Sequence, residues 1–176
     1  AHLGGGISVS AHHYGKVVDG NNALNGEGPF SPERAGTLPA RQLVDMCFSG
    51  KYTYAEIRKM INGRGGLVAH LGTTDVQSII RWAHAGAEKH KLVLDAMLYT
   101  VAKQVGAMLI ALYGQNDAVI LTGGIAFNDY CIQGLREWLE GLAPIVVIPG
   151  EDEMGALAMN ALGVLRGELT LLSYSS

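Results

Sequence analysis

Charged residues are scarce in this chain of 176 residues. They make up 16% of the sequence, whereas about 25% is usual for a soluble domain. The formal net charge is −3, and no cluster of lysine and arginine is present. Nucleic acid and anionic membranes both attract concentrated basic patches, so we expect neither as a partner. The 48% of apolar residues predicts a real core, and the low share of charged residues predicts a surface that another domain or subunit covers.

Cysteine is also rare. Cys47 and Cys131 are far apart and form no CxxC motif, so we expect reduced thiols in a cytoplasmic protein. The sequence shows no signal-peptide pattern and no apolar run of membrane length. An initiating methionine is missing, and the first residues already lead into a glycine turn. We therefore expect a part of a longer protein.

Alternating and β-branched residues predict a hairpin whose strands lie at 7–10 and 16–19, with a turn around Gly15. Residues 20–39 are irregular and rich in Gly, Asn and Pro, which is typical of functional loops. Apolar periodicity, caps and stop signals then predict helices over about 38–49, from a Thr53–Glu56 capping box to 61, from Thr73-Thr74-Asp75 to about 84, over 87–113, over 129–141 and over 152–167.

Two short apolar runs, 118–121 and 145–148, predict buried parallel strands. Gly106, inside the long helix, predicts close packing against a neighbouring element. The long helix could serve the core of the domain or a subunit interface. The order of elements indicates a mixed α/β domain whose parallel strands are joined by a helical crossover.

Consecutive glycines at Gly4, Gly5 and Gly6 form the first candidate site. Without Cβ atoms, their N–H groups can approach an anion closely, so this loop could cradle a phosphate. It is not a P-loop, because no Lys-Ser/Thr pair follows the glycines. A plain glycine turn is the alternative. His2 is of interest only because it adjoins this loop.

The ends of the two parallel strands are further candidates. Gly123 and Gly124 follow the first strand, at the position where open α/β sheets bind ligands, although a tight turn would need the same residues. Asn128 follows closely enough to cap the next helix. Asp152 and Glu153 follow the second strand and suit Mg²⁺, or they simply complement the helix dipole.

Arg34 lies in a loop stiffened by Pro29 and Pro32. Its guanidinium suits a carboxylate or a transferring phosphoryl group, and an ordinary surface arginine is the alternative. Asp75 either caps a helix or lies near a ribose. The remaining histidines have no metal-ligand spacing and are expected to be structural. Together, the glycine turns, Arg34 and the carboxylates indicate nucleotide and phosphoryl handling.

Four segments, taken in order, resemble those of butyrate kinases: residues 2–8, 26–34, 121–126 and 149–154. The resemblance covers essentially the whole chain, and Phe-Ser-Pro-Glu-Arg at 30–34 favours butyrate kinase over the related acetate kinase. It implies an α/β, RNase-H-like domain of the actin-like ATPase type, with a five-stranded mixed sheet flanked by helices. Three strands would be antiparallel and two parallel, with the third antiparallel strand near residues 22–24.

The same resemblance implies that residues 1–176 form the C-terminal nucleotide-binding domain of a cytoplasmic two-domain kinase. The enzyme would use ATP and Mg²⁺ to phosphorylate a short-chain fatty acid, butanoate, to an acyl phosphate. Its own N-terminal domain and further copies, as a dimer or higher oligomer, are the implied partners, and the fragment alone is expected to be inactive. A branched-chain or other carboxylate kinase, or a non-catalytic chaperone- or actin-like nucleotide-binding module, is the alternative.

The resemblance also implies roles for single residues. Arg34 would meet the carboxylate and the transferring phosphoryl group, and Asp152 or Glu153 would be the metal-linked acid. The nucleotide would contact a set made of His2, Gly4, Gly5, Gly6, Asp75, Gly123, Gly124, Ile125 and Asn128. Acetate kinase has Asn at the position of Gly5 and Phe-Arg in place of Val76-Gln77, so contacts there must differ.

Overall fold

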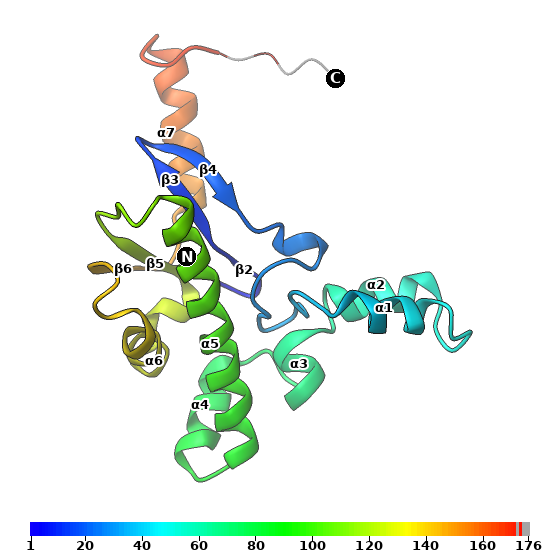
Figure 1. Ribbon diagram of the computed structural model, residues 1–176. Helices are drawn as coiled ribbons and strands as arrows, with labels where there is room; N and C mark the ends of the chain where they lie inside the picture. The colour runs from blue at the N-terminus through cyan, green and yellow to red at the C-terminus, as the bar shows by residue number, and fades with distance from the viewer. Residues whose placement is uncertain (172, 174–176) are drawn as a thin grey trace.

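A four-stranded sheet lies at the centre of the computed structural model, which describes residues 1–171 and 173 (Figure 1). In the strand order β2-β1-β5-β6, β1 runs antiparallel to β2 and parallel to β5, and β5 runs parallel to β6. The strands are β1 His2–Leu3, β2 Ile7–Ser8, β5 Val119–Gly123 and β6 Ile145–Pro149. The mixed α/β class and the parallel pair are therefore confirmed.

A separate hairpin consists of β3 (Ser10–His13) and β4 (Lys16–Gly20). Tyr14 and Gly15 in its turn both have positive φ angles, 48° and 74°, as a tight two-residue hairpin turn requires. The predicted hairpin is thus confirmed in kind. Its first strand begins later than predicted, because β2 pairs with β1 instead of with β4.

The expected five-stranded sheet is wrong, because the sheet has four strands. The chain leaves the ladder at Val9, whose N–H donates to Asn21 Oδ1 at 2.6 Å instead of to a neighbouring strand. The segment near residues 22–24, expected to be a strand, forms a 3₁₀ helix, η1 (Ala23–Asn25). Glu27 Oε2 accepts a backbone N–H just before this helix and closes the turn.

The predicted helices are all present, with ends shifted by a few residues. Thr53 and Glu56 form the predicted capping box, in which Glu56 Oε2 accepts from Thr53 N at 2.7 Å. A further helix, α3, is not indicated by the sequence pattern, which reads as a glycine turn there. The helices are α1 Ala40–Cys47, α2 Tyr54–Ile61, α3 Gly66–Leu71, α4 Val76–His84, α5 Glu88–Ala111, η2 Gly124–Phe127, α6 Asp129–Leu139 and α7 Glu153–Leu165.

The core lies between the sheet and α5, which packs against α4 and α6 (Figure 1). Leu94, Met97 and Val101 of α5 are fully buried, as are Leu3 and Leu121 of the sheet. By length and composition α5 could cross a membrane, contrary to the expectation that no such run exists. Its buried side chains show that it is the core helix here.

Gly106 does not pack closely against a neighbour, so that prediction is wrong. No heavy atom lies within 4 Å of the point where its Cβ would be. The second parallel strand is not buried as predicted either. On β6, Val146 is 43% exposed and Ile148 is 55% exposed, because β6 is the edge of the sheet and nothing in the described residues covers this face.

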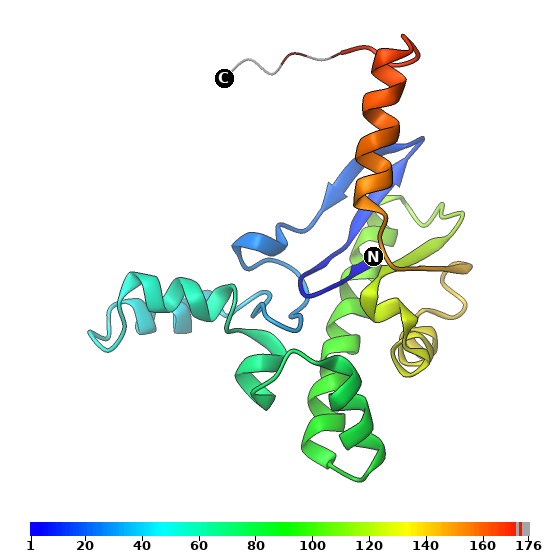
Figure 2. The ribbon, with the colours of Figure 1, turned by 180° about the vertical axis from the view of Figure 1, so that it is seen from behind.

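Helix α7 extends away from the sheet, as both views show (Figures 1 and 2). It is apolar on most of its surface, and Met154, Leu157, Met159 and Leu165 are between 64% and 83% exposed. A helix that is apolar all round is normally buried. The helix and the exposed face of β6 therefore fit the predicted surface that another part of the protein covers.

Candidate functional site

The turn between β1 and β2 forms the glycine loop, Gly4–Gly6. This loop lies at the end of the sheet where β1 ends. Gly4 N donates to Gly6 O at 3.1 Å, which closes the turn. Within the described residues, the N–H groups of Gly5 and Gly6 donate to no other group. Such backbone donors suit a phosphate, because no Cβ prevents the approach of the anion.

Arg34 lies directly over this loop. A Cβ atom on Gly6 would overlap Arg34 Nη1 and Cζ, so only glycine leaves room for the guanidinium. Arg34 Nε is buried and has no hydrogen-bond partner in the described residues. Since a buried donor without a partner is costly, this N–H points to a ligand or to another part of the protein that completes the site.

His2 and an acidic side chain flank the glycine loop. His2 Nε2 lies 3.2 Å from Glu151 Oε2, and a Cβ on Gly4 would come within 3.0 Å of the same nitrogen. The contact joins the end of β1 to the segment after β6. Glu151 was not among the predicted site residues, since a run of three acids does not tell which one faces the loop.

Asp152 and Glu153, the predicted metal-linked acids, start α7. Asp152 Oδ1 accepts from Gly155 N at 2.8 Å and so caps the helix. A role at the start of the helix was the alternative to binding Mg²⁺. Glu153 is exposed in the first turn. The described residues contain no group of three or more His, Cys, Asp or Glu that could hold a metal ion. Mg²⁺ usually needs only one or two protein carboxylates besides phosphates and water, so the exposed acids at 151–153 fit it.

The two strand ends meet beside the glycine loop, as predicted. Gly123 and Gly150 exchange two backbone hydrogen bonds of 3.0 Å, and Thr122 Oγ1 also donates to Gly150 O. Gly123 has a φ of 89° and lies against the backbone of Leu3, so a Cβ there would overlap Leu3 O. Gly124 has open space around its Cβ position. The sheet edge thus brings the predicted phosphate and nucleotide loops together.

Within the described residues, no side-chain hydrogen bond or ion pair links three other predicted residues to this cluster. The side chain of Ile125 is buried in the core, which leaves only its backbone for a ligand. Asn128 stands at the start of α6 but makes no side-chain capping bond. Asp75 caps α4 by accepting from Ser78 N and Oγ, and these bonds lower the pKa of its carboxyl group. Their nucleotide roles stay predictions.

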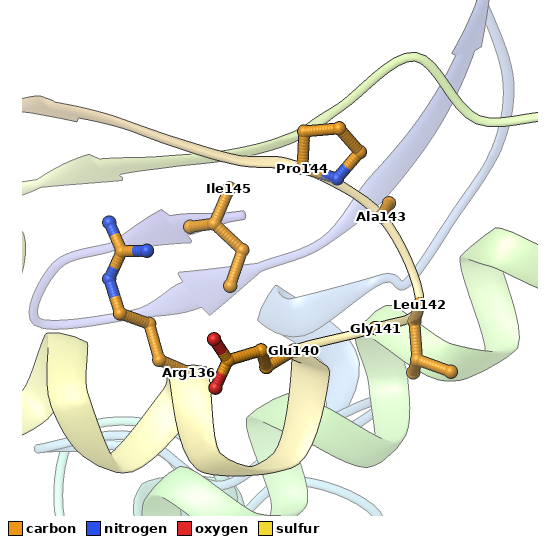
Figure 3. A pocket seen from close by; sticks show the side chains of 7 residues that line it. All are labelled: Arg136, Glu140, Gly141, Leu142, Ala143, Pro144 and Ile145. Carbon is orange, nitrogen blue, oxygen red and sulfur yellow. The ribbon is translucent and has the colours of Figure 1, made fainter.

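A hollow of about 450 Å³ lies elsewhere, between the end of α6 and the start of β6 (Figure 3). Arg136 and Glu140 line it together with the loop 141–145. Because β6 begins here and ends at the glycine loops, the hollow and the glycine loops lie at opposite ends of the strand. It therefore takes no part in the cluster around Arg34.

Known proteins match nearly the whole length of this chain. The model of the acetokinase family matches residues 1–145. Over 173 residues the chain is 67% identical to a "Probable butyrate kinase" of Phocaeicola vulgatus and 59% identical to one of Bacteroides thetaiotaomicron. Each match covers 98% of this chain and 49% of the relative. The chain thus spans about half the length of the curated relatives it matches.

A solved structure, the acetate kinase of Porphyromonas gingivalis, superposes with a TM-score of 0.80. The match covers 93% of this chain and 48% of that protein, at 23% sequence identity. At this identity the likeness establishes the fold, which is that of the acetate kinases.

Proposed function

This chain belongs to the acetokinase family, and we propose that it is the nucleotide-binding half of a carboxylate kinase. The full-length protein would transfer the γ-phosphoryl group of ATP to a short-chain fatty acid, with butanoate as the first candidate because the relatives are named as probable butyrate kinases. The observation that carries the proposal is Arg34, whose guanidinium lies over Gly6 beside free backbone donors and whose Nε has no partner in the described residues.

The chemistry suits a site built for positioning and charge neutralisation. A carboxylate is already ionised at neutral pH, so no general base is needed. Its oxygen attacks the γ-phosphorus, and the bond from that phosphorus to the β–γ bridging oxygen breaks, which yields an acyl phosphate and ADP. Hydrogen-bond donors aimed at the developing charge are the main source of rate enhancement in such transfers.

Each part of the cluster has a role in this proposal. The glycine loop would hold phosphate oxygens, and Arg34 would hold the carboxylate and the transferring group. The strand-end glycines would adjoin the nucleotide. The carboxylates at 151–153 would hold Mg²⁺, which neutralises phosphate charge when bound. His2 would keep Glu151 beside the glycine loop.

The proposed activity belongs to the longer protein. The preceding half would supply the rest of the site, and residues 1–176 alone would bind nucleotide weakly and form no acyl phosphate. Free thiols at Cys47 and Cys131 and the use of ATP favour the cytoplasm as the location. Further copies of the protein are expected as partners.

Replacing the arginine in the full-length protein tests the proposal. We expect Arg34→Ala to lower kcat by about a hundredfold or more, since a lost charge-stabilising donor costs about that much. ATP affinity, measured by calorimetry, should change little. A chaperone- or actin-like ATP switch has no need of this arginine, so an unchanged turnover would argue for such a module. Equal losses of turnover and ATP binding would contradict the role given to Arg34.

A further inference from the structure

Ser31 is the one fully buried polar side chain in the part of the chain that the structure describes. Its Oγ donates to Gly5 O at 2.8 Å and accepts from Arg34 N at 3.1 Å. A single hydroxyl thus joins the glycine loop to the residue that carries the guanidinium. Glu33 N also donates to Gly5 O, at 3.3 Å, so the side-chain bond is the shorter of the two links.

The other side of the arginine loop is held by backbone alone. Leu67 N donates to Ser31 O, and Val68 N donates to Pro32 O, each at 3.0 Å. These are free N–H groups of the first turn of α3, which a loop carbonyl satisfies. A Cβ on Gly66 would overlap Ser31 O, so the approach requires glycine there.

The turn before α3 completes this grip. Gly63 N and Gly65 N both donate to Glu33 O, at 2.8 and 3.1 Å, and Ala35 N donates to the carbonyl of Ile61 at 2.9 Å. The loop is therefore fixed from behind at several points. On the side of the glycine loop, its position depends chiefly on the Ser31 hydroxyl.

We propose that Ser31 is a positioning residue that sets the place of the Arg34 guanidinium over the glycine loop. This inference rests on the proposed function of Arg34. Ser31 touches neither substrate in this arrangement and acts through its neighbours. Without the hydroxyl, the Gly5 carbonyl and the Arg34 N–H lose a buried partner, and of these two links between the loops only the longer bond from Glu33 N to Gly5 O remains.

A double-mutant cycle in the full-length protein tests this, with Ser31→Ala, Arg34→Ala and the combined variant. We expect Ser31→Ala to lower kcat about ten- to a hundredfold, the range given by a lost buried hydrogen bond, with little change in the KM for ATP. In the Arg34→Ala background the same change should alter kcat less than about twofold, because a residue acting only through Arg34 has nothing left to position.

Two further variants separate positioning from packing. Ser31→Cys keeps the site filled with a slightly larger side chain that is only a weak donor, so we expect it to be impaired like Ser31→Ala. Thr100→Ala removes a hydroxyl that donates to Met97 O on α5, away from the site, and should leave kcat unchanged.

Three results would overturn the inference. One is an equal loss of kcat from Ser31→Ala with and without Arg34, which would mean a general structural effect. Another is full activity in Ser31→Cys, which would assign the effect to packing. If Arg34→Ala itself leaves kcat unchanged, the proposed function fails together with the inference. The first two results overturn only the inference, so the two failures can be told apart.

Discussion

The guanidinium of Arg34 occupies the space that a side chain on Gly6 would need, so the two residues depend on each other. The φ angle of Gly6 is not in the left-handed region, so its backbone admits alanine. An added Cβ would instead push away the flexible end of Arg34. We expect Gly6→Ala to lower kcat about as much as Arg34→Ala, about a hundredfold, while the melting temperature changes little.

Steady-state kinetics and thermal unfolding of the full-length variants check this. Gly106→Ala is the matched control, since its Cβ position is open and alanine favours a helix. It should leave kcat unchanged. Normal turnover in Gly6→Ala would mean that the guanidinium is not needed where the structure places it.

The two cysteines differ sharply in environment. Cys131 is buried in the core, and burial, with a smaller contribution from the charge of Asp95, raises the pKa of its thiol to about 12. Cys47 is exposed. We expect a thiol reagent at pH 8 to modify Cys47 and spare Cys131 until the protein unfolds, as peptide mass mapping would show. Rapid native labelling of Cys131 would contradict its burial.

The same shift has a consequence for stability. The pKa of the Cys131 thiol is higher in the folded protein than its unfolded value of 9.0. Folding therefore favours the neutral thiol, and ionisation of the thiol favours unfolding. This contribution is complete below about pH 9 and is lost as the pH rises toward 12. A Cys131→Ala variant should therefore lose less stability than the parent protein over that alkaline range.

Among the elements, helices with strong caps or long apolar periodicity could be predicted from the sequence. Thr53 with Glu56, and the long run of α5, carry their signals locally. The strands could be predicted only in part, because the Asn21 side chain diverts Val9 from the sheet. Helix α3 could not be predicted, since the loop carbonyls that hold its first turn come from residues about 36 positions earlier.

The candidate site was also predictable in part. Glycine turns and carboxylates at strand ends place the loops at one sheet edge, because parallel strands end together. The choice of Glu151 over its acidic neighbours depends on side-chain directions after β6, which the sequence does not encode locally. Ser31 gave no signal, because a buried hydroxyl in a loop has no characteristic pattern.

The start of α3 offers a test of how the arginine loop is held. Gly66 has a φ of 61° and its Cβ position overlaps Ser31 O, whereas Gly72 has a φ of 76° and open space. Gly72→Ala should cost about 1–2 kcal/mol of backbone strain. We expect Gly66→Ala to cost several times more, as measured by chemical unfolding of the full-length variants. Equal losses at both positions would contradict the close packing of α3 on the loop.

At the scale of the whole molecule, some apolar surface is not covered by the described residues. Side chains of α7, and Val146 and Ile148 on β6, are exposed although they are apolar. The curated relatives are about twice as long as this chain, so the additional half is the proposed cover. In the full-length protein, Leu157→Asp should then destabilise by about 2 kcal/mol or more.

Thermal unfolding of full-length variants checks that burial. Tyr14→Ser, at the highly exposed hairpin turn, is the control and should change the melting temperature little. If Leu157→Asp is equally neutral, α7 stays exposed and the other half does not cover it.

The activity itself can be tested by measuring acyl phosphate, trapped as the hydroxamate, with the full-length protein, ATP, Mg²⁺ and butanoate. A carboxylate kinase forms one acyl phosphate for each ADP, and we expect that stoichiometry from the full-length protein and no product from residues 1–176 alone. Release of ADP and inorganic phosphate without acyl phosphate, for butanoate, acetate and isobutyrate alike, would contradict it.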